Sequence, residues 1–195
     1  MCTGRWAKCT GNLLFPLALC CIVANILLFF PNGEVWGTEQ IMESVWYFPG
    51  VIGGGVLVLL PASVMRAAGM EGSCFANRCG MMVSMLLSAV GVAGALYCMI
   101  VSVVGLQDGP LCDTGDGIFI YPFFNQTLNE SYLFNQEVWD VCEHPKNAVL
   151  WNIVLFSILL GVGTLEAVLS LSQVANGLLG CLCGTCMNKR QGNMA

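Results

Sequence analysis

The sequence is short of charged residues and has a single histidine. Of its 195 residues, seven are Lys or Arg and twelve are Asp or Glu, so only 10% are charged, against roughly a quarter in soluble domains. Apolar residues make up 56%, and the mean hydropathy is +0.74. So few charges cannot cover a water-exposed surface, and we expect most of the surface to face lipid. The seven scattered cations and the net charge of -5 exclude a basic face for nucleic acid.

The sequence also lacks a recognisable catalytic or phosphate-binding pattern. The only histidine, His144, precedes a proline, and no Ser/His/Asp or Cys/His set can be assembled around it. The glycine run at 53–55 follows no predicted strand and has no Lys-Ser/Thr partner, so it does not resemble a phosphate-binding loop. We predict that the chain is not an enzyme and uses no cofactor.

Four apolar runs are long enough for an α-helix to cross the hydrocarbon layer, which takes about 20 residues. The first has no signal-peptidase-like cleavage site, so we expect it to stay in the protein. The sequence predicts an all-α membrane protein, a four-transmembrane-helix bundle with a small disulfide-closed domain between the third and fourth helices. The predicted divisions are spans at 13–30, 45–65, 81–106 and 148–172, outer loops at 31–44 and 107–147, and inner segments at 1–12, 66–80 and 173–195.

The positions of the charges predict the orientation. Six of the seven cations lie in the segments predicted to be inner, whereas ten of the twelve acids lie in the two loops predicted to be outer. Because short cytoplasmic loops are enriched in Lys and Arg, both termini are expected in the cytoplasm. We predict an integral multi-pass protein of the plasma membrane, with an endolysosomal membrane as the alternative.

The large loop at 107–147 has the features of an exoplasmic segment. It holds two N-glycosylation sequons, at Asn125 and Asn129. Its only cysteines, Cys112 and Cys142, would be exposed to an oxidising compartment, so we predict a disulfide between them. Residues 128–142 have the pattern of a short amphipathic helix, with Phe134, Val138 and Val141 on one face. We expect the aromatic surface of this loop to pack on the short outer loop, and the alternative is a partner protein.

Glu166 is the only acid inside a predicted span, where a charge costs at least ~2.5 kcal/mol. One hypothesis is a proton- or ligand-linked site near the cytoplasmic leaflet. The hypothesis that we favour is a structural carboxyl that faces Ser84 or Ser88 of the third span. Asn25 and Asn152 are expected to form hydrogen bonds between helices near the outer surface.

Small residues spaced by four predict close helix packing, and a proline predicts a kink. The pairs are 84/88 and 91/95 in the third span and 157/161 and 163/167 in the fourth. The glycine run at 53–55 should likewise allow close helix packing, and Pro61 should kink the second span near its inner end.

Seven of the twelve cysteines lie at the predicted inner membrane surface, where reducing conditions disfavour disulfides. Cysteines beside apolar helix ends are typical substrates for S-palmitoylation. The spacing of 181, 183 and 186 does not match the paired Cys-x-x-Cys pattern of zinc sites, so no metal site is predicted. Unmodified thiols are the other alternative. The palmitoylation candidates are Cys2, Cys9, Cys74, Cys79, Cys181, Cys183 and Cys186.

Several stretches, in this order along the whole chain, resemble the transmembrane-four L-six family of tetraspanin-like surface proteins, and its intestine and liver members in particular. They are MCTG at 1–4, NILLFFPNGE at 25–34, GGG at 53–55, GPLC at 109–112, WDVCEHP at 139–145, WNIVLFSILL at 151–160 and GCLCG at 180–184. Two features differ. The large loop lacks the Cys-Cys-Gly motif of true tetraspanins, and the inner loop keeps only Cys74 and Cys79 of the denser cysteine cluster found in relatives.

The resemblance implies a glycosylated, palmitoylated four-span membrane organiser rather than an enzyme. Such a protein would associate laterally with integrins, growth-factor receptors and tetraspanins, and would influence adhesion, migration or proliferation. Membrane lipid, including cholesterol, and a second copy of the chain are further expected partners. The alternative function is small-molecule or lipid binding, sensing or transport within the bundle near Glu166.

Overall fold

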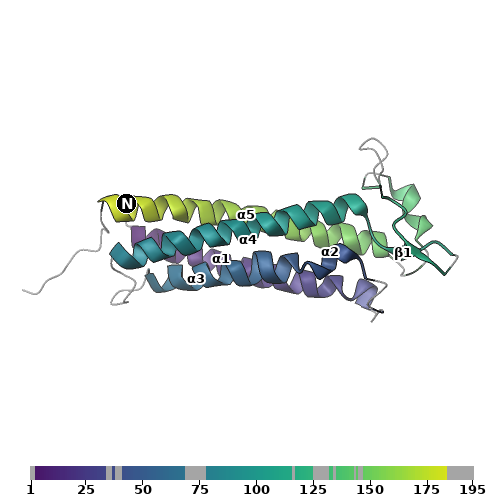
Figure 1. Ribbon diagram of the computed structural model, residues 1–195, viewed down its shortest axis with the longest axis horizontal. Helices are drawn as coiled ribbons and strands as arrows, with labels where there is room; N and C mark the ends of the chain where they lie inside the picture. The colour runs from purple at the N-terminus through teal and green to yellow at the C-terminus, as the bar shows by residue number, and fades with distance from the viewer. Residues whose placement is uncertain are drawn as a thin grey trace, which may run out of the picture.

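Four long helical segments lie side by side in an elongated bundle, and a small domain covers one end (Figure 1). A computed structural model describes residues 3–33, 37, 41–68, 78–115, 117–124, 132–133, 135–142, 144 and 147–183. The bundle consists of α1 (Thr3–Leu28), α2 (Glu43–Trp46), the π-helix η3 (Pro49–Val56), α3 (Leu57–Ala68), α4 (Arg78–Asp108) and α5 (Ala148–Cys183). The short elements are the 3-10 helices η1 (Pro31–Gly33) and η6 (Gln136–Val141) and the strands β1 (Cys112–Asp113) and β2 (Phe119–Ile120).

Four segments are long and apolar enough to cross a membrane, namely Arg5–Leu28, Glu43–Ala67, Met82–Asp108 and Ala148–Leu179. The predicted all-α bundle of four membrane-spanning helices is therefore confirmed, and the chain is an integral multi-pass membrane protein. α5 has 36 residues and a length of about 54 Å at 1.5 Å per residue. We call the end of the bundle that carries β1 and β2 the outer end, and the opposite end the inner end.

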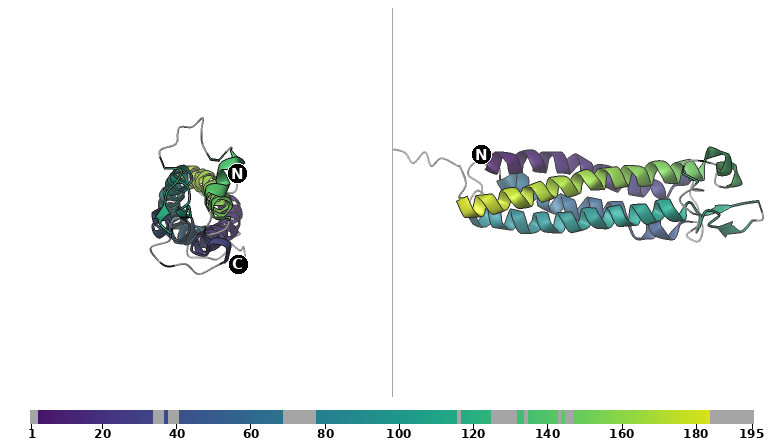
Figure 2. Two further views of the ribbon diagram at one scale, coloured as in Figure 1. Left: turned by 90° about the vertical axis from the view of Figure 1, so that its right-hand side faces the viewer. Right: turned by 90° about the horizontal axis from the view of Figure 1, so that it is seen from above.

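The lipid-facing surface of the bundle is apolar, and its interior contains small and polar residues. Leu19, Val23, Ile100 and Leu165 are exposed on the outside of the helices, whereas Asn25, Ser84 and Glu166 are buried, as are Ala18 and Ala95. This distribution suits a lipid solvent. In lipid, burying apolar side chains gives little driving force for helix association, and most of it comes from close contacts and hydrogen bonds between helices. α4 and α5 lie against each other along much of their length (Figure 2).

The second span is interrupted near its outer end, which the sequence did not predict. α2 ends at Trp46, Phe48 has a left-handed backbone with φ of +46°, and Pro49 begins the π-helix η3. Pro49 has no N–H group, and four of the seven residues that follow it in η3 are glycines. Regular α-helix is therefore weakly favoured in this stretch. The regular helix breaks here, before η3, whereas Pro61 lies inside the continuous helix α3.

Two glycines allow the backbones of η3 and α4 to touch. A Cβ atom on Gly53 would lie 2.7 Å from the carbonyl oxygen of Gly94, and one on Gly94 would lie 2.7 Å from that of Gly53. Any side chain at either position would therefore separate the two helices. The sequence indicated Gly53 as a packing residue, and the structure identifies α4 as its partner.

The small pairs of α5 do not all pack inside the bundle. Gly163 lies against Ala95 and Met99 of α4, as the spacing predicted. Ser157 and Gly161 are exposed, and no atom lies within 4 Å of the position of a Cβ on Gly161. The 157/161 pair therefore does not pack between the helices of this bundle, because that face of α5 points away from α1 and α4.

Substitution of Gly53 tests this contact. We expect Gly53→Ala to lower the free energy of unfolding by about 1–3 kcal/mol, the usual cost of overpacking, because the new methyl group meets backbone atoms that cannot rotate away. Gly161→Ala is the matched control and should change it by less than about 1 kcal/mol. Unfolding of the full chain in detergent micelles measures both. Equal effects of the two substitutions would contradict the proposed contact.

Candidate functional site

Glu166 lies inside the bundle, on the face of α5 that meets α1 and η3. Its side chain is fully buried, and the Cys21 thiol of α1 donates a long hydrogen bond to Oε2, with a distance of 3.9 Å between sulfur and oxygen. Among the described residues, Oε1 has no hydrogen-bond partner. Gly54 leaves just enough room for this arrangement, since a Cβ there would lie 2.7 Å from the Cys21 sulfur and 3.0 Å from Glu166 Oε2.

The prediction that Glu166 faces Ser84 or Ser88 is wrong. Ser88 donates to the backbone carbonyl of Ser84, and Ser84 Oγ accepts a hydrogen bond of 3.1 Å from Gln173 Nε2. Gln173 is seven residues after Glu166 on α5, or about 10 Å farther along the helix axis. Ser84, Ser88 and Gln173 thus form a separate buried hydrogen-bonded group, nearer the inner end than Glu166.

A second buried thiol, that of Cys98, lies in the same part of the bundle as Cys21. The Cys98 thiol, which belongs to α4, donates to the carbonyl of Leu159 over 3.8 Å, and Cys98 is buried beside Cys21 in the same apolar cluster. Leu159 is eleven residues after Ala148, the first residue of α5, and Glu166 is seven residues farther on. Glu166 therefore lies about 27 Å along α5 from its outer end.

Asn25 links α1 to the irregular part of the second span. Its Oδ1 accepts a hydrogen bond of 3.3 Å from the backbone N–H of Val51 in η3. The predicted hydrogen bond between helices near the outer end is therefore present, and its donor is a backbone group that the sequence could not identify. The bond supplies a partner to an N–H group that would otherwise be buried in an apolar layer.

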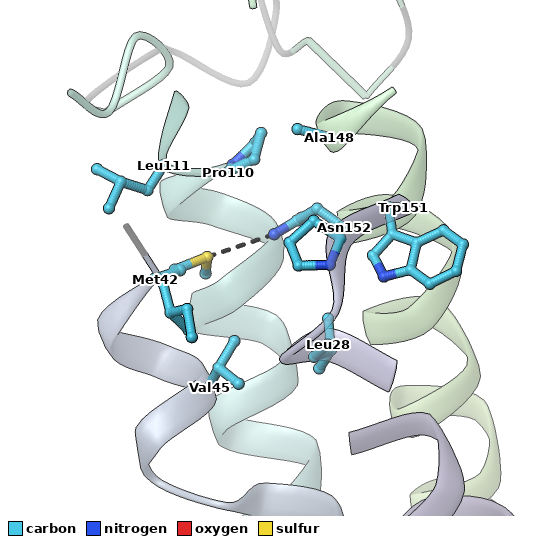
Figure 3. Close-up of a pocket in the computed structure, with 10 residues that line it drawn as sticks. Leu28, Met42, Val45, Pro110, Leu111, Ala148, Trp151 and Asn152 are labelled. Atoms are coloured by element: carbon cyan, nitrogen blue, oxygen red, sulfur yellow. Dashed lines mark hydrogen bonds between the residues drawn. The ribbon is translucent and has the colours of Figure 1, made fainter. Parts of the chain in front are cut away.

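Asn152 lies at the outer end of α5, beside a small cavity (Figure 3). Its amide nitrogen Nδ2 points at the sulfur of Met42 over 3.3 Å, while Oδ1 is buried and has no hydrogen-bond partner among the described residues. A buried acceptor without a donor costs about 1–3 kcal/mol. The cavity has a volume of about 40 Å³, and its walls come from the outer ends of α1, α2 and α5, including Leu28 and Val45, and from the segment after α4, including Leu111.

The outer domain is closed by the predicted disulfide between Cys112 and Cys142, whose Cα atoms are 5.5 Å apart. Both cysteines are buried beside Phe123 and Tyr132, whose rings stack with centroids 4.5 Å apart. The Tyr132 hydroxyl donates a hydrogen bond of 2.7 Å to the carbonyl of Leu106 near the end of α4. Burial raises the pKa of Tyr132 above its ordinary value, so the hydroxyl stays neutral.

The prediction of one helix over 128–142 is wrong within the described residues. Tyr132 and Leu133 form a turn, and helical structure is limited to the six residues of η6. Val138 packs against the disulfide cluster, but Val141 is exposed. The disulfide and the aromatic core hold this segment against the end of the bundle in place of a continuous amphipathic helix. Phe134 and 128–131 lie outside the described residues.

A small hairpin, which the sequence did not reveal, forms the other half of the outer domain. β1 and β2 pair in antiparallel orientation, with Cys112 opposite Ile120. The turn between them is held by Asp113, whose Oδ1 accepts hydrogen bonds of 2.9 and 3.0 Å from the N–H groups of Gly115 and Gly117. The signal for this turn is the Asp-Thr-Gly-Asp-Gly run at 113–117, which is typical of Asx turns.

Tyr121 joins the outer domain to the second span. The backbone N–H of Glu43, the first residue of α2, donates a hydrogen bond of 3.1 Å to the Tyr121 hydroxyl. Tyr121 and Leu111 also pack against the apolar cluster that contains Met42. Burial, together with the carboxylate of Glu43, raises the pKa of Tyr121. The structure thus places part of the large loop on the end of the short loop, as we expected from its aromatic surface.

Most of the predicted modification sites lie where the structure describes no side chain. Asn125, Asn129, Cys2, Cys74 and Cys186 lie outside the described residues. Cys79 lies in the first turn of α4, and Cys181 and Cys183 lie in the last turn of α5. Cys9 is exposed on α1, as is Cys20, which is not among the predicted sites. Within the described part of the chain, no group of three or more His, Cys, Asp or Glu could hold a metal ion.

Removal of the disulfide tests how far it stabilises the outer domain. The two cysteines are 30 residues apart, so replacing both by Ser should loosen this domain by about 3–4 kcal/mol on the chain-entropy account. We expect faster proteolytic cleavage within 107–147 of the full chain in micelles, with the helices intact. Cys20→Ser, which removes an exposed thiol of α1, is the control. Equal cleavage rates in the variant and the unaltered protein would contradict this role.

Comparison with known proteins covers nearly the whole chain. The family model described as L6 membrane protein matches residues 1–187. Human transmembrane 4 L6 family member 1 is 44% identical over 200 residues, which is 98% of each chain. Bovine member 5 is 43% identical over 99% of each chain, and mouse member 4 is 44% identical over 95% of this chain and 94% of its own. No solved structure matches. With the four spans and the closed outer domain, these matches show that the chain belongs to the L6 family of tetraspanin-like membrane proteins.

Proposed function

We propose that this L6-family chain is a non-enzymatic membrane organiser that binds other membrane proteins laterally through its outer domain. By the family resemblance, its partners are adhesion proteins and receptors, including integrins, growth-factor receptors and tetraspanins. Binding them would modulate adhesion, migration or proliferation. The proposal rests chiefly on an exposed apolar surface in the part of the chain that lies beyond the spans.

That surface consists of Ile118, Ile120 and Phe124, which are 64, 45 and 61% exposed. All three lie outside the segments that can span a membrane and belong to the hairpin or the turn after it. Large apolar side chains that are exposed to water favour contact with another protein. The hairpin extends beyond the ends of the helices (Figure 2), so this surface is accessible to the ectodomain of a neighbouring membrane protein.

The outer domain is also well fixed to the bundle. Tyr121 holds it to the start of α2, and Tyr132 holds it to the end of α4. The disulfide fixes the remaining segment. A surface with so little freedom loses little conformational entropy when a partner binds, which favours a recognition role for it.

We further propose that the inner cysteines are S-acylated and that Asn125 and Asn129 carry glycans, with both termini in the cytoplasm and the protein at the plasma membrane. Exposure of Cys9 on the lipid-facing side of α1 supports acylation at that position. Four spans already anchor the chain, so the acyl chains would govern lateral clustering rather than attachment.

The alternative function, a ligand or transport site at Glu166, has less support. One carboxylate oxygen already accepts a hydrogen bond from Cys21, and Gly54 packs closely against the same group. The Lys and Arg residues of the described part of the chain, such as Lys8 and Arg66, lie towards the inner end rather than beside this carboxyl. A single acid without an intramembrane cation or a second acid makes a poor relay, so we assign Glu166 a structural role.

Substitution of the exposed apolar surface tests the proposed function. We expect Ile120→Ser combined with Phe124→Ser to lower co-precipitation of an integrin or a growth-factor receptor from mild detergent by roughly tenfold or more, since apolar anchors often contribute over 1 kcal/mol each. Val141→Ser, which changes an exposed apolar residue elsewhere in the outer domain, is the control. Recovery of these partners unchanged by the double substitution would overturn the proposal. Replacing the seven inner cysteines by Ser, in a separate variant, tests the clustering role.

Removal of the sequons tests the orientation. Only lumenal segments are glycosylated. We therefore expect Asn125→Gln and Asn129→Gln each to lower the apparent mass of the protein by one glycan. The double variant should migrate like the glycosidase-treated protein. Gel migration before and after glycosidase treatment measures this. Asn135→Gln, which lies in the same loop but in no sequon, should cause no shift. A protein insensitive to glycosidase would argue against an exoplasmic large loop.

A further inference from the structure

The cavity beside Asn152 combines apolar walls with one buried hydrogen-bond acceptor. Its volume of about 40 Å³ holds a few water-sized groups. It therefore has room for a small polar group, but none for a sugar or a phosphate head group. Leu28, Val45, Leu111 and Ala148 contribute apolar surface to its lining.

The donor that Asn152 Oδ1 needs does not come from the described residues around it. The Nδ2 of the same side chain points at Met42, and the indole N–H of Trp151, which also lines the cavity, donates to the carbonyl of Leu27 over 2.9 Å. Oδ1 itself is buried without a partner. An occupant that donates one hydrogen bond would therefore complete the site.

The surroundings restrict the charge of that occupant. An amide oxygen repels an anion, and the lining residues include no Lys, Arg or His that would attract one. They also include no Asp or Glu to balance a cation, so an ammonium group would be buried unpaired at high cost. A neutral hydroxyl fits both restrictions, since it donates one hydrogen bond and carries no net charge.

The level of the cavity along the bundle indicates what carries the hydroxyl. It lies where the outer ends of the spans meet the outer domain, beside the partly buried Trp151 and on the same side of the membrane as Trp46. Tryptophan side chains prefer the membrane–water interface. A lipid of the outer leaflet whose only polar part is a hydroxyl would place that group at this level and its apolar body among the hydrocarbon chains.

We propose that this cavity binds the hydroxyl group of a neutral lipid alcohol, which donates a hydrogen bond to Asn152 Oδ1 while its apolar part lies against the lining residues. Sterols and long-chain alcohols share this chemistry. The site is separate from the apolar surface of the hairpin and from Glu166, and it stands or falls independently of the proposed organiser function.

Photolabelling of the full chain in lipid nanodiscs tests the proposal. The probes are a long-chain alcohol and a sterol, each with a diazirine near the hydroxyl, and the methyl ether of each, which lacks the donor. We expect at least one alcohol to label the peptides around Met42 or Leu111 about tenfold more than its ether, the factor that corresponds to one net hydrogen bond. The probe that shows this preference identifies the source of the hydroxyl.

Two substitutions locate the site, and one serves as control. Asn152→Leu removes the acceptor, and Ala148→Leu keeps it but fills the cavity, so both should lower labelling by the alcohol to the level of its ether. Ser170→Ala removes a different buried polar group, a hydroxyl that has no partner among the described residues. It lies about 27 Å from Asn152 along α5, so this substitution should leave labelling unchanged. If Asn152→Leu does not fold, as judged by gel filtration and thermal unfolding, Ala148→Leu decides the outcome.

Three results would overturn the proposal. The first is equal labelling by the alcohols and their ethers, and the second is labelling that persists in Ala148→Leu. The third is an absence of labelling around the cavity with both alcohols, in which case the cavity holds water only.

Discussion

Close contact between backbones in the middle of the bundle is the constraint on which the rest of the structure depends. In lipid, the hydrophobic effect gives little attraction between helices, so close van der Waals packing and buried hydrogen bonds must supply that attraction. Gly53 and Gly94 bring η3 against α4, and Gly54 brings η3 against Cys21 of α1. This approach also places the Cys21 thiol within reach of Glu166. A side chain at any of these glycines would push apart the helices that hold the polar groups in place.

The break after α2 and the π-helix that follows it leave backbone groups without regular helical partners, and side chains of neighbouring helices supply those partners. Asn25 of α1 accepts from the Val51 N–H, and the Tyr97 hydroxyl of α4 donates to the Tyr47 carbonyl over 2.8 Å. Lipid offers neither a donor nor an acceptor, so irregular backbone at this depth persists only where protein side chains satisfy it. Asn25 and Tyr97 are therefore parts of the second span's structure, although they belong to other helices.

The sequence predicts those features that depend on composition or on one segment at a time. The four spans follow from apolar length, and the pairing of Cys112 with Cys142 follows from their isolation in one loop. It does not predict features that depend on how helices are offset and rotated. Residue counts along single helices place Ser84 opposite Glu166, but in the structure Ser84 pairs with Gln173. Ser157 and Gly161 have the spacing of a packing pair, yet the rotation of α5 points them outwards.

The outer domain is held firmly against the helices because aromatic side chains form hydrogen bonds with backbone groups at the helix ends. The last carbonyl groups of a helix have no partner within it. Tyr132 of the outer domain donates to Leu106 near the end of α4, and Trp151 of α5 donates to Leu27 near the end of α1. At the start of α2, the Tyr121 hydroxyl accepts a hydrogen bond from the backbone N–H of Glu43. A partner that displaces the outer domain must therefore break the bonds of Tyr132 and Tyr121, and the second of these ties the outer domain to the start of α2.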